Sequence, residues 1–174
     1  GFGYNTGEFL TGSIPKKHYY IAYYLHFGLW YRHSSNNAAA LISESIDTLA
    51  NAYVYTGDAK YGRAGAILLD RVADLYPDFN WYLWKGVHGN EYRGKIIDCI
   101  WSAGVLSPKL VKAYDAFFPI YEDAQLGRYL NDKAKALKLD NLKDSPEAMR
   151  KNVEDNILRE TFEDCKRGRV SGNF

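Results

Sequence analysis

From about residue 36 onward, apolar residues recur three or four positions apart, which is the spacing of one face of an α-helix. The first stripe of this kind consists of Ala38, Ile42, Ile46, Leu49 and Tyr53. The turn Thr56-Gly57-Asp58 follows it. Gly57 suits the left-handed position that ends a helix, and Asp58 suits the N-cap of the next one. We therefore predict that one helix ends and another begins at this turn.

A second stripe starts directly after the turn and stops before Pro77. It consists of Tyr61, Ala64, Leu68, Val72 and Leu75. Two helices that are joined by so short a connection must lie antiparallel. The region from about residue 36 to residue 75 is thus predicted to form a helical hairpin.

Two further pairs of helices are predicted after this hairpin. The first pair is a helix over residues 92–103, closed by Gly104, and a helix that starts at Ser107-Pro108, a cap followed by proline. The second of these helices would place on one side Leu110, Tyr114, Phe117 and Tyr121. The last pair is less regular. It is a helix over residues 127–139 and a long helix that Ser145-Pro146 opens and Gly168 ends, with Met149, Val153, Ile157 and Cys165 along it.

No segment of any length alternates like a β-strand, so the chain is predicted to be all-α. Hairpins that recur every 40 to 50 residues, roughly, suggest a repeat architecture. No motif is copied from one hairpin to the next, which disfavours a solenoid. A ring of unlike hairpins, an (α/α) toroid, fits better, and these hairpins would make only part of one. We predict one incomplete toroid domain over residues 1–174.

Composition and charge narrow the possible functions. Aromatic residues make up 16% of the chain, with fifteen Tyr and four Trp, which suits either an aromatic core or a wet sugar-binding groove. A net charge of +1 predicts no affinity for nucleic acid or for membrane surfaces. No apolar run reaches the roughly 20 residues that span a bilayer. The two cysteines, Cys99 and Cys165, fit no metal-site spacing, and whether they pair stays open.

The two ends suggest a processed or partial chain. It begins at Gly1 without a Met, carries no signal-peptide pattern, and reaches Phe174 without a visible domain boundary.

The residues of the first hairpin are distinctive. The run from Asn37 to Asp58 ends in Tyr-Val-Tyr-Thr-Gly-Asp at residues 53–58, and Tyr61 and a Leu-Leu-Asp run at 68–70 follow it. This combination resembles the early hairpin of the heparinase II/III-like polysaccharide lyases. Residues 94–101 with 112–117 resemble the next hairpin of that family. The closing run Gly-Arg-Val-Ser-Gly-Asn-Phe at 168–174 is similar to the approach to the family's catalytic Asn or His segment.

The resemblance implies a two-part protein, with an incomplete α/α toroid, a β-sandwich region and an active site in the cleft between them. The β-sandwich region would belong to the remainder of the polypeptide, outside residues 1–174. The implied substrate is an acidic polysaccharide that contains uronic acid, and the implied location is the periplasm or the outside of the cell. No cofactor and no metal is assigned to these residues.

Such enzymes cleave their substrate by β-elimination. One group must neutralise the substrate carboxylate as the adjacent C5 proton leaves, which suits Asn, His or Arg. Another group, commonly Tyr or His, must take that proton. From its place in the Ser-Gly-Asn-Phe segment, Asn173 is the predicted neutraliser, with an ordinary loop or capping role as the alternative. Asn36 and Asn37 are rivals, but an Asn just ahead of a helix is typical of a cap.

Substrate-binding candidates lie in two aromatic segments. Residues 78–90 have no helical period, and Trp81, Tyr82 and Trp84 are predicted to stack on sugar rings, although a buried plug at the end of the toroid would use the same residues. His88 and Arg93 flank a glycine-rich turn that opens a helix, where a carboxylate could be held. A solvated loop is the alternative for these two.

The second aromatic segment runs from His18 to His33. Its histidines at 18, 26 and 33 are eight and seven residues apart, whereas metal ligands on one helix usually lie three or four apart. His26 and Tyr23 are therefore predicted to line the substrate cleft, with core packing as the alternative.

Two other functional classes stay open. A glycoside hydrolase on an α/α toroid would need two carboxylates across a cleft. Its candidates are Glu44, Asp47, Asp70, Asp78, Glu91 and Asp98. Those on helices could equally be solvated or paired with cations. A non-catalytic helical binding module is the third class, and the absence of a copied motif disfavours it.

Overall fold

The computed structural model describes residues 41–78 and 107–166. Within these ranges every regular element is a helix. They are the α-helices α3 (Leu41–Thr56), α4 (Ala59–Leu75), α7 (Ser107–Phe117), α8 (Ala124–Ala136), α9 (Pro146–Val153) and α10 (Glu160–Lys166), the 3-10 helices η3 (Tyr76–Asp78) and η6 (Phe118–Glu122), and the π-helix η7 (Glu154–Arg159). The predicted all-α class is confirmed for the described part of the chain.

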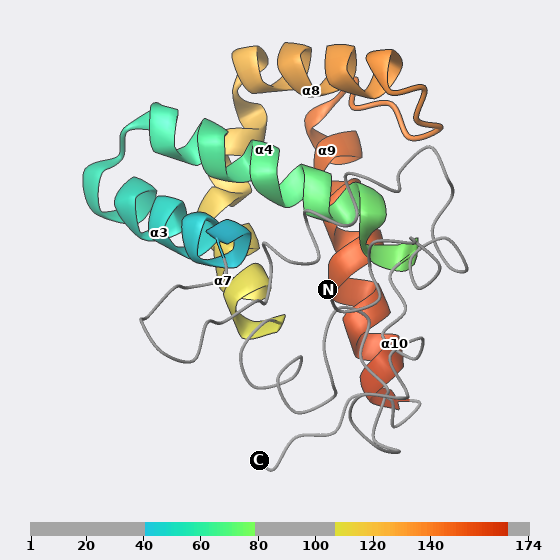
Figure 1. The fold of residues 1–174 in the computed structure, drawn as a ribbon. Coiled ribbons are helices and arrows are strands. Elements are labelled where there is room, and N and C mark those ends of the chain that lie inside the picture. The colour runs from blue at the N-terminus through green and yellow to red at the C-terminus, as the bar shows by residue number, and fades with distance from the viewer. Residues whose placement is uncertain (1–40, 79–106, 167–174) are drawn as a thin grey trace, which may run out of the picture.

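Helices α3 and α4 form the predicted hairpin, and Figure 1 shows them side by side. The turn between them has the predicted chemistry. Gly57 adopts a left-handed φ of 67°, and its N–H donates to the carbonyl of Tyr53 at 2.8 Å. The carboxylate of Asp58 accepts from the N–H of Lys60 at 2.9 Å and so caps α4. Gly57 and Asp58 therefore fix where one helix stops and the other starts.

The predicted apolar stripe of α4 is partly wrong. Ala64 is exposed and Leu68 is only partly buried, whereas Gly62, Gly65 and Leu69 are buried. The buried face is therefore turned from the predicted one. The cause is a close approach of α7 to the small residues of α4, because a Cβ on Gly65 would lie only 2.0 Å from Cζ of Phe117. A pattern of apolar side chains does not reveal a face that is built on glycine.

The aromatic side of α7 agrees with the prediction. The helix starts at Ser107, with Pro108 in its first turn. The four residues predicted to share one side are all buried, namely Leu110, Tyr114, Phe117 and Tyr121. Tyr121 lies in η6, so the 3-10 turn continues the buried side beyond the end of α7.

Helix α8 starts three residues before the predicted residue 127, because Asp123 caps it. The carboxylate of Asp123 accepts from the N–H groups of Gln125 and Leu126 at 2.8 and 2.9 Å. The helix ends before Lys138, which has a left-handed φ of 53°.

The last predicted helix is confirmed at its start, where Ser145 Oγ accepts from the N–H of Ala148 at 3.1 Å. Met149, Val153 and Ile157 are buried along it, as predicted. The sequence pattern did not reveal that the helix widens into a π-helix at Glu154–Arg159 before α10 continues it. The predicted stop at Gly168 lies outside the described residues.

Helix α4 is central to the hydrophobic core, because it contacts α3, α7, α8 and α9. In Figure 1, α8 crosses above α4, and the α9–α10 helix passes its C-terminal half. The core side chains that are fully enclosed include Ile46, Leu69, Leu75, Leu110, Phe117, Tyr121 and Leu126. None of the helices in these two ranges has both the length and the apolar composition to cross a bilayer. The predicted helix over residues 92–103 and the block 18–33 lie outside the described residues.

Candidate functional site

The residues predicted to act on substrate lie outside the ranges that the structure describes. They are Asn173, Trp81, Tyr82, Trp84, His88, Arg93, His26 and Tyr23. The rival residues Asn36, Asn37, Glu91 and Asp98 also lie outside. What the structure does place are the side chains of three carboxylates considered for a hydrolase, together with a charged cluster that surrounds one of them. A fourth candidate, Asp78, is described only as the last residue of η3.

Two of these carboxylates, Glu44 and Asp47, lie on α3 and pair with α7. Glu44 forms an ion pair with Lys109, and Asp47 lies 3.1 Å from the ammonium of Lys112. All four side chains are partly exposed. Such pairs contribute little stability because water screens them. Of the two alternatives to a catalytic role, solvation and pairing with a cation, Glu44 and Asp47 therefore show pairing.

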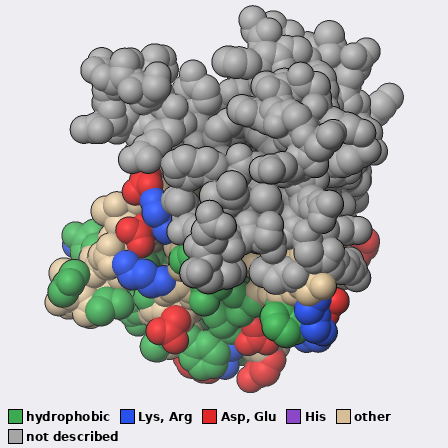
Figure 2. Space-filling view, turned by 90° about the horizontal axis from the view of Figure 1, so that it is seen from below, with side chains coloured by type: hydrophobic (Ala, Val, Ile, Leu, Met, Phe, Trp, Pro, Cys, Tyr) green, Lys and Arg blue, Asp and Glu red, His purple; other side chains and the backbone are tan. Residues whose placement is uncertain are grey.

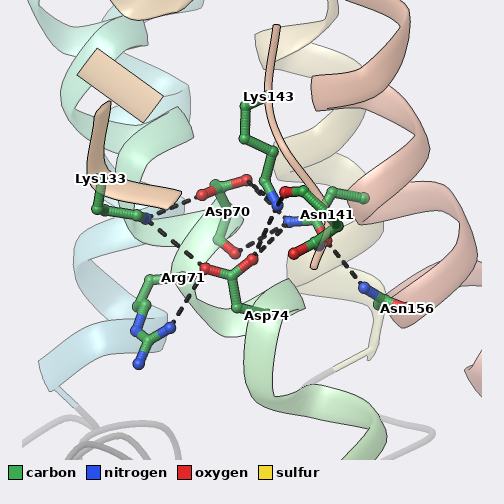
Figure 3. Close-up of polar contacts among 8 residues, drawn as sticks. Asp70, Arg71, Asp74, Lys133, Asn141, Lys143 and Asn156 are labelled. Carbon is green, nitrogen blue, oxygen red and sulfur yellow. Dashed lines mark hydrogen bonds and ion pairs between the residues drawn. The ribbon is translucent and has the colours of Figure 1, made fainter. Parts of the chain in front are cut away.

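The third carboxylate, Asp70, is fully buried and belongs to a charged cluster. Asp70 and Asp74 lie one turn apart on α4, with side chains 0% and 1% exposed. Lys133 of α8 donates to Asp70 Oδ2 at 2.9 Å. Lys143, from the loop between α8 and α9, donates to Asp74 Oδ1 at 3.0 Å. Figure 3 shows both lysines converging on the two carboxylates from different elements.

Asn152 of α9 completes this buried charged cluster. Its amide nitrogen lies 2.8 Å from Asp70 Oδ1 and 3.0 Å from Asp74 Oδ1. Its carbonyl oxygen accepts from the amides of Asn141 and Asn156 at 2.6 and 2.8 Å. Four segments, α4, α8, the α8–α9 loop and the helix that starts with α9, thus meet through polar contacts in the interior (Figure 3).

The ion pairs and hydrogen bonds inside the cluster offset the free-energy cost of burying its charged groups. A buried ion is costly unless charge and hydrogen bonds satisfy it. Every carboxylate oxygen here has a cation or amide beside it, including Asp74 Oδ2, which lies 3.3 Å from the guanidinium of Arg71. Asp70 is therefore held as a structural anion and does not have the exposure that a cleft carboxylate needs to reach a substrate.

Three tyrosines near this cluster keep their protons at neutral pH. Burial raises the pKa of Tyr76 to about 12 and raises the pKa of Tyr121 well above its usual value. Burial, followed by the hydrogen bond to Glu154, also raises the pKa of Tyr114. A general base must lose its proton readily. These three side chains are therefore poor candidates for the base of an elimination.

The described surface carries charges of both signs. Figure 2 shows Lys and Arg side chains interspersed with Asp and Glu and with hydrophobic side chains over the described part of one face. Two exposed hydrophobic residues, Val54 and Tyr55, lie at the end of α3, where Tyr55 is 86% exposed. Phe118 is also exposed, with the guanidinium of Arg150 4.2 Å from its ring centre. Among residues 41–78 and 107–166, no cluster of His, Cys, Asp or Glu could hold a metal ion.

Sequence reasoning missed most of the buried charged cluster. One signal was present, since Asp70 and Asp74 are four residues apart and border Leu69 and Leu75 on a buried helix face. Charged residues at such positions indicate internal pairing. Nothing in the sequence indicated that Lys143 is buried, because a lysine in a polar loop is ordinarily solvated.

Comparisons of the chain with known proteins add no relative. No protein-family model, no curated protein and no solved structure matches it.

Proposed function

We propose that this chain is part of a polysaccharide lyase that cleaves a uronic-acid-containing glycan by β-elimination. The observation that carries the proposal is the helical hairpin from Leu41 to Leu75, because its turn holds the Tyr-Thr-Gly-Asp sequence at residues 55–58 that is part of the resemblance. The motif thus stands in a helix–turn–helix, which is the context that the resemblance requires.

The proposed chemistry assigns roles on both sides of the substrate. Asn173 donates a hydrogen bond to the uronate carboxylate and stabilises the negative charge that builds up as the C5 proton leaves. Trp81, Tyr82 and Trp84 stack on the sugar rings, with Tyr23 and His26 lining the same cleft. His88 and Arg93 bind a further carboxylate of the acidic chain.

The state of the carboxylates supports elimination over hydrolysis. A glycoside hydrolase needs two carboxyl groups that face each other across a cleft. Glu44 and Asp47 pair with lysines of α7, and Asp70 is buried. A hydrolase would therefore have to use carboxylates other than these three.

The proposed fold is an incomplete (α/α) toroid that spans residues 1–174 as one domain. The α3–α4 hairpin and the packing of α7 and α9 on α4 are consistent with such a ring. The proposed complete protein adds a β-sandwich region, acts without a cofactor bound by these residues, and works in the periplasm or outside the cell.

The test is incubation of the complete protein with a panel of uronate polysaccharides. Elimination creates an unsaturated uronate, which is followed by its ultraviolet absorbance, whereas hydrolysis yields new reducing ends without that absorbance. Asn173→Ala is expected to lower kcat by about 100-fold or more, the usual effect of removing one donor to a developing anion. Asn51→Ala is the matched control, because within the described ranges the Asn51 side chain makes only a long 3.4 Å hydrogen bond to Asp47.

A second pair of variants tests the aromatic residues. Trp81→Ala is expected to raise KM, whereas Tyr55→Ala, which removes an exposed aromatic side chain on α3, should leave KM unchanged. Reducing ends without ultraviolet absorbance, on any member of the panel, would replace the lyase proposal by a hydrolase.

A further inference from the structure

We propose that the folded chain joins Lys143 to Asp74 through an isopeptide bond between Nζ and Cγ, and that Asp70 transfers the protons. This modification site would make the buried charged cluster a covalent link between the α8–α9 loop and α4. The inference rests on the described residues alone and is independent of the proposed lyase activity.

The two reacting groups are held in contact with each other and shielded from the solvent. Lys143 Nζ lies 3.0 Å from Asp74 Oδ1, and the two side chains are 0% and 1% exposed. Among the described residues, this ammonium also contacts the carbonyl of Asn141 at 3.2 Å and Asp70 Oδ1 at 3.7 Å. Two reacting groups that are fixed side by side gain a large effective concentration. Exclusion of water also protects the resulting amide from hydrolysis.

The groups around Asp74 match the charge that the reaction develops. Attack of the amine on Cγ places negative charge on the carboxyl oxygens. Arg71 lies 3.3 Å and Lys133 3.9 Å from Asp74 Oδ2, and the amide of Asn152 lies 3.0 Å from Oδ1. Donors that are already in place around a developing oxyanion lower the barrier to acyl transfer.

Asp70 is placed to move the protons. Its Oδ1 atom is 3.7 Å from Lys143 Nζ, and its position one turn from Asp74 puts it beside both reactants. A carboxylate next to an ammonium and a leaving hydroxyl can take a proton from the first and return it to the second.

The step balances without an added reagent. Lys143 loses its ammonium proton to Asp70 and attacks Cγ of Asp74 as a neutral amine, so a C–N bond forms. One carboxyl oxygen receives that proton from Asp70 and a second proton, also through Asp70, from the attacking nitrogen, and it leaves as water when its C–O bond breaks. One ammonium and one carboxylate become one amide and one water. Because the reaction removes one cation and one anion, the charge of the cluster is unchanged and its interior holds two fewer ions.

The test is the intact mass of the purified, folded protein, measured under denaturing conditions. The expected mass is lower than the sequence mass by one water. A tryptic digest should contain residues 72–85 joined to residues 139–150, because a modified Lys143 is no longer a cleavage site. A full sequence mass in protein whose circular dichroism is helical overturns the proposal. A water loss that maps to a single peptide, as a succinimide would, also overturns it.

Variants assign the roles of the three residues. Lys143→Arg and Asp74→Ala should each restore the full sequence mass, and Asp70→Asn should slow or abolish the water loss although both reacting residues are present. Lys112→Arg on α7 is the matched control, since Lys112 pairs with Asp47 outside the cluster and its replacement should leave the joined peptide in place. Water loss that persists in Lys143→Arg would refute the assigned bond.

Discussion

Gly65 offers a sharp test of how α4 and α7 pack. In an exposed helix, Gly→Ala would stabilise by about 1 kcal/mol through helix propensity. At this position the new Cβ would lie 2.0 Å from Cζ of Phe117 and 2.7 Å from two further ring atoms. Ordinary carbon contacts are at roughly 3.5 to 4.0 Å, so the ring has to move. Phe117 is 0% exposed, which leaves its ring no solvent to move into.

The expected net effect is destabilisation. Overpacking a tight core costs about 1 to 3 kcal/mol, and the severity of this overlap places Gly65→Ala at the upper end. After the propensity gain is subtracted, the free energy of unfolding should fall by about 2 kcal/mol. Urea unfolding followed by circular dichroism measures it, and with a slope of about 1 to 3 kcal/mol per molar the midpoint should fall by about 1 M.

Gly127→Ala on α8 is the matched control. Its Cβ would meet only Cε of Met149, at an ordinary 3.6 Å, so this variant should gain about 0.5 to 1 kcal/mol. Combining Gly65→Ala with Phe117→Leu should cost less than the sum of the two single changes, because the smaller side chain relieves the overlap. A Gly65→Ala protein as stable as the wild type would refute the close approach of the two helices.

Two further predictions concern charged groups. Asp70→Ala should lower the free energy of unfolding by about 3 kcal/mol, because it removes one of the two carboxylates that compensate the charges of Lys133 and Lys143. Asp115→Ala on the exposed side of α7 should change this free energy by no more than about 0.5 kcal/mol in the same urea assay. The pKa of Asp123 is lowered, first by the N–H of Leu126 and then by Arg63, from its usual 3.8. Its contribution to stability is therefore complete above pH 3.8 and is lost as the pH falls through the lower folded-state pKa. Urea midpoints measured at decreasing pH should converge for wild type and Asp123→Asn, and parallel curves would contradict this.

The start or end of a helix could be predicted where a nearby capping residue determines it. Gly57, Asp58 and Ser145 act on backbone groups within four residues, so their caps follow from short sequence windows. The start of α8 was missed, although Asp123 is the same kind of cap and the buried residues Leu126, Leu130 and Ala134 follow it at helical spacing.

Features that depend on distant residues could not be predicted. The buried face of α4 is set by Phe117 packing on Gly65, two positions 52 residues apart in sequence (117 minus 65). The buried charged cluster joins residues 63 to 82 positions apart, as in Lys133 with Asp70 and Asn152 with Asp70. The local pattern shows which residues are apolar, but it does not show which distant helix or side chain packs against them. The predicted catalytic and binding residues lie outside the described ranges, and their roles stay predictions.

The π-helix at Glu154–Arg159 makes the chain tolerant of a change in length at that place. Each residue of an α-helix turns the chain by about 100°, and a π-helical turn holds more residues than an α-helical one. Deleting one residue from this turn would let it close as an ordinary α-helix, and α10 would keep nearly its present orientation about its axis. The same deletion within α9 would rotate α10 by roughly that angle. Single-residue deletions should therefore do less harm in the π-helix than in α9.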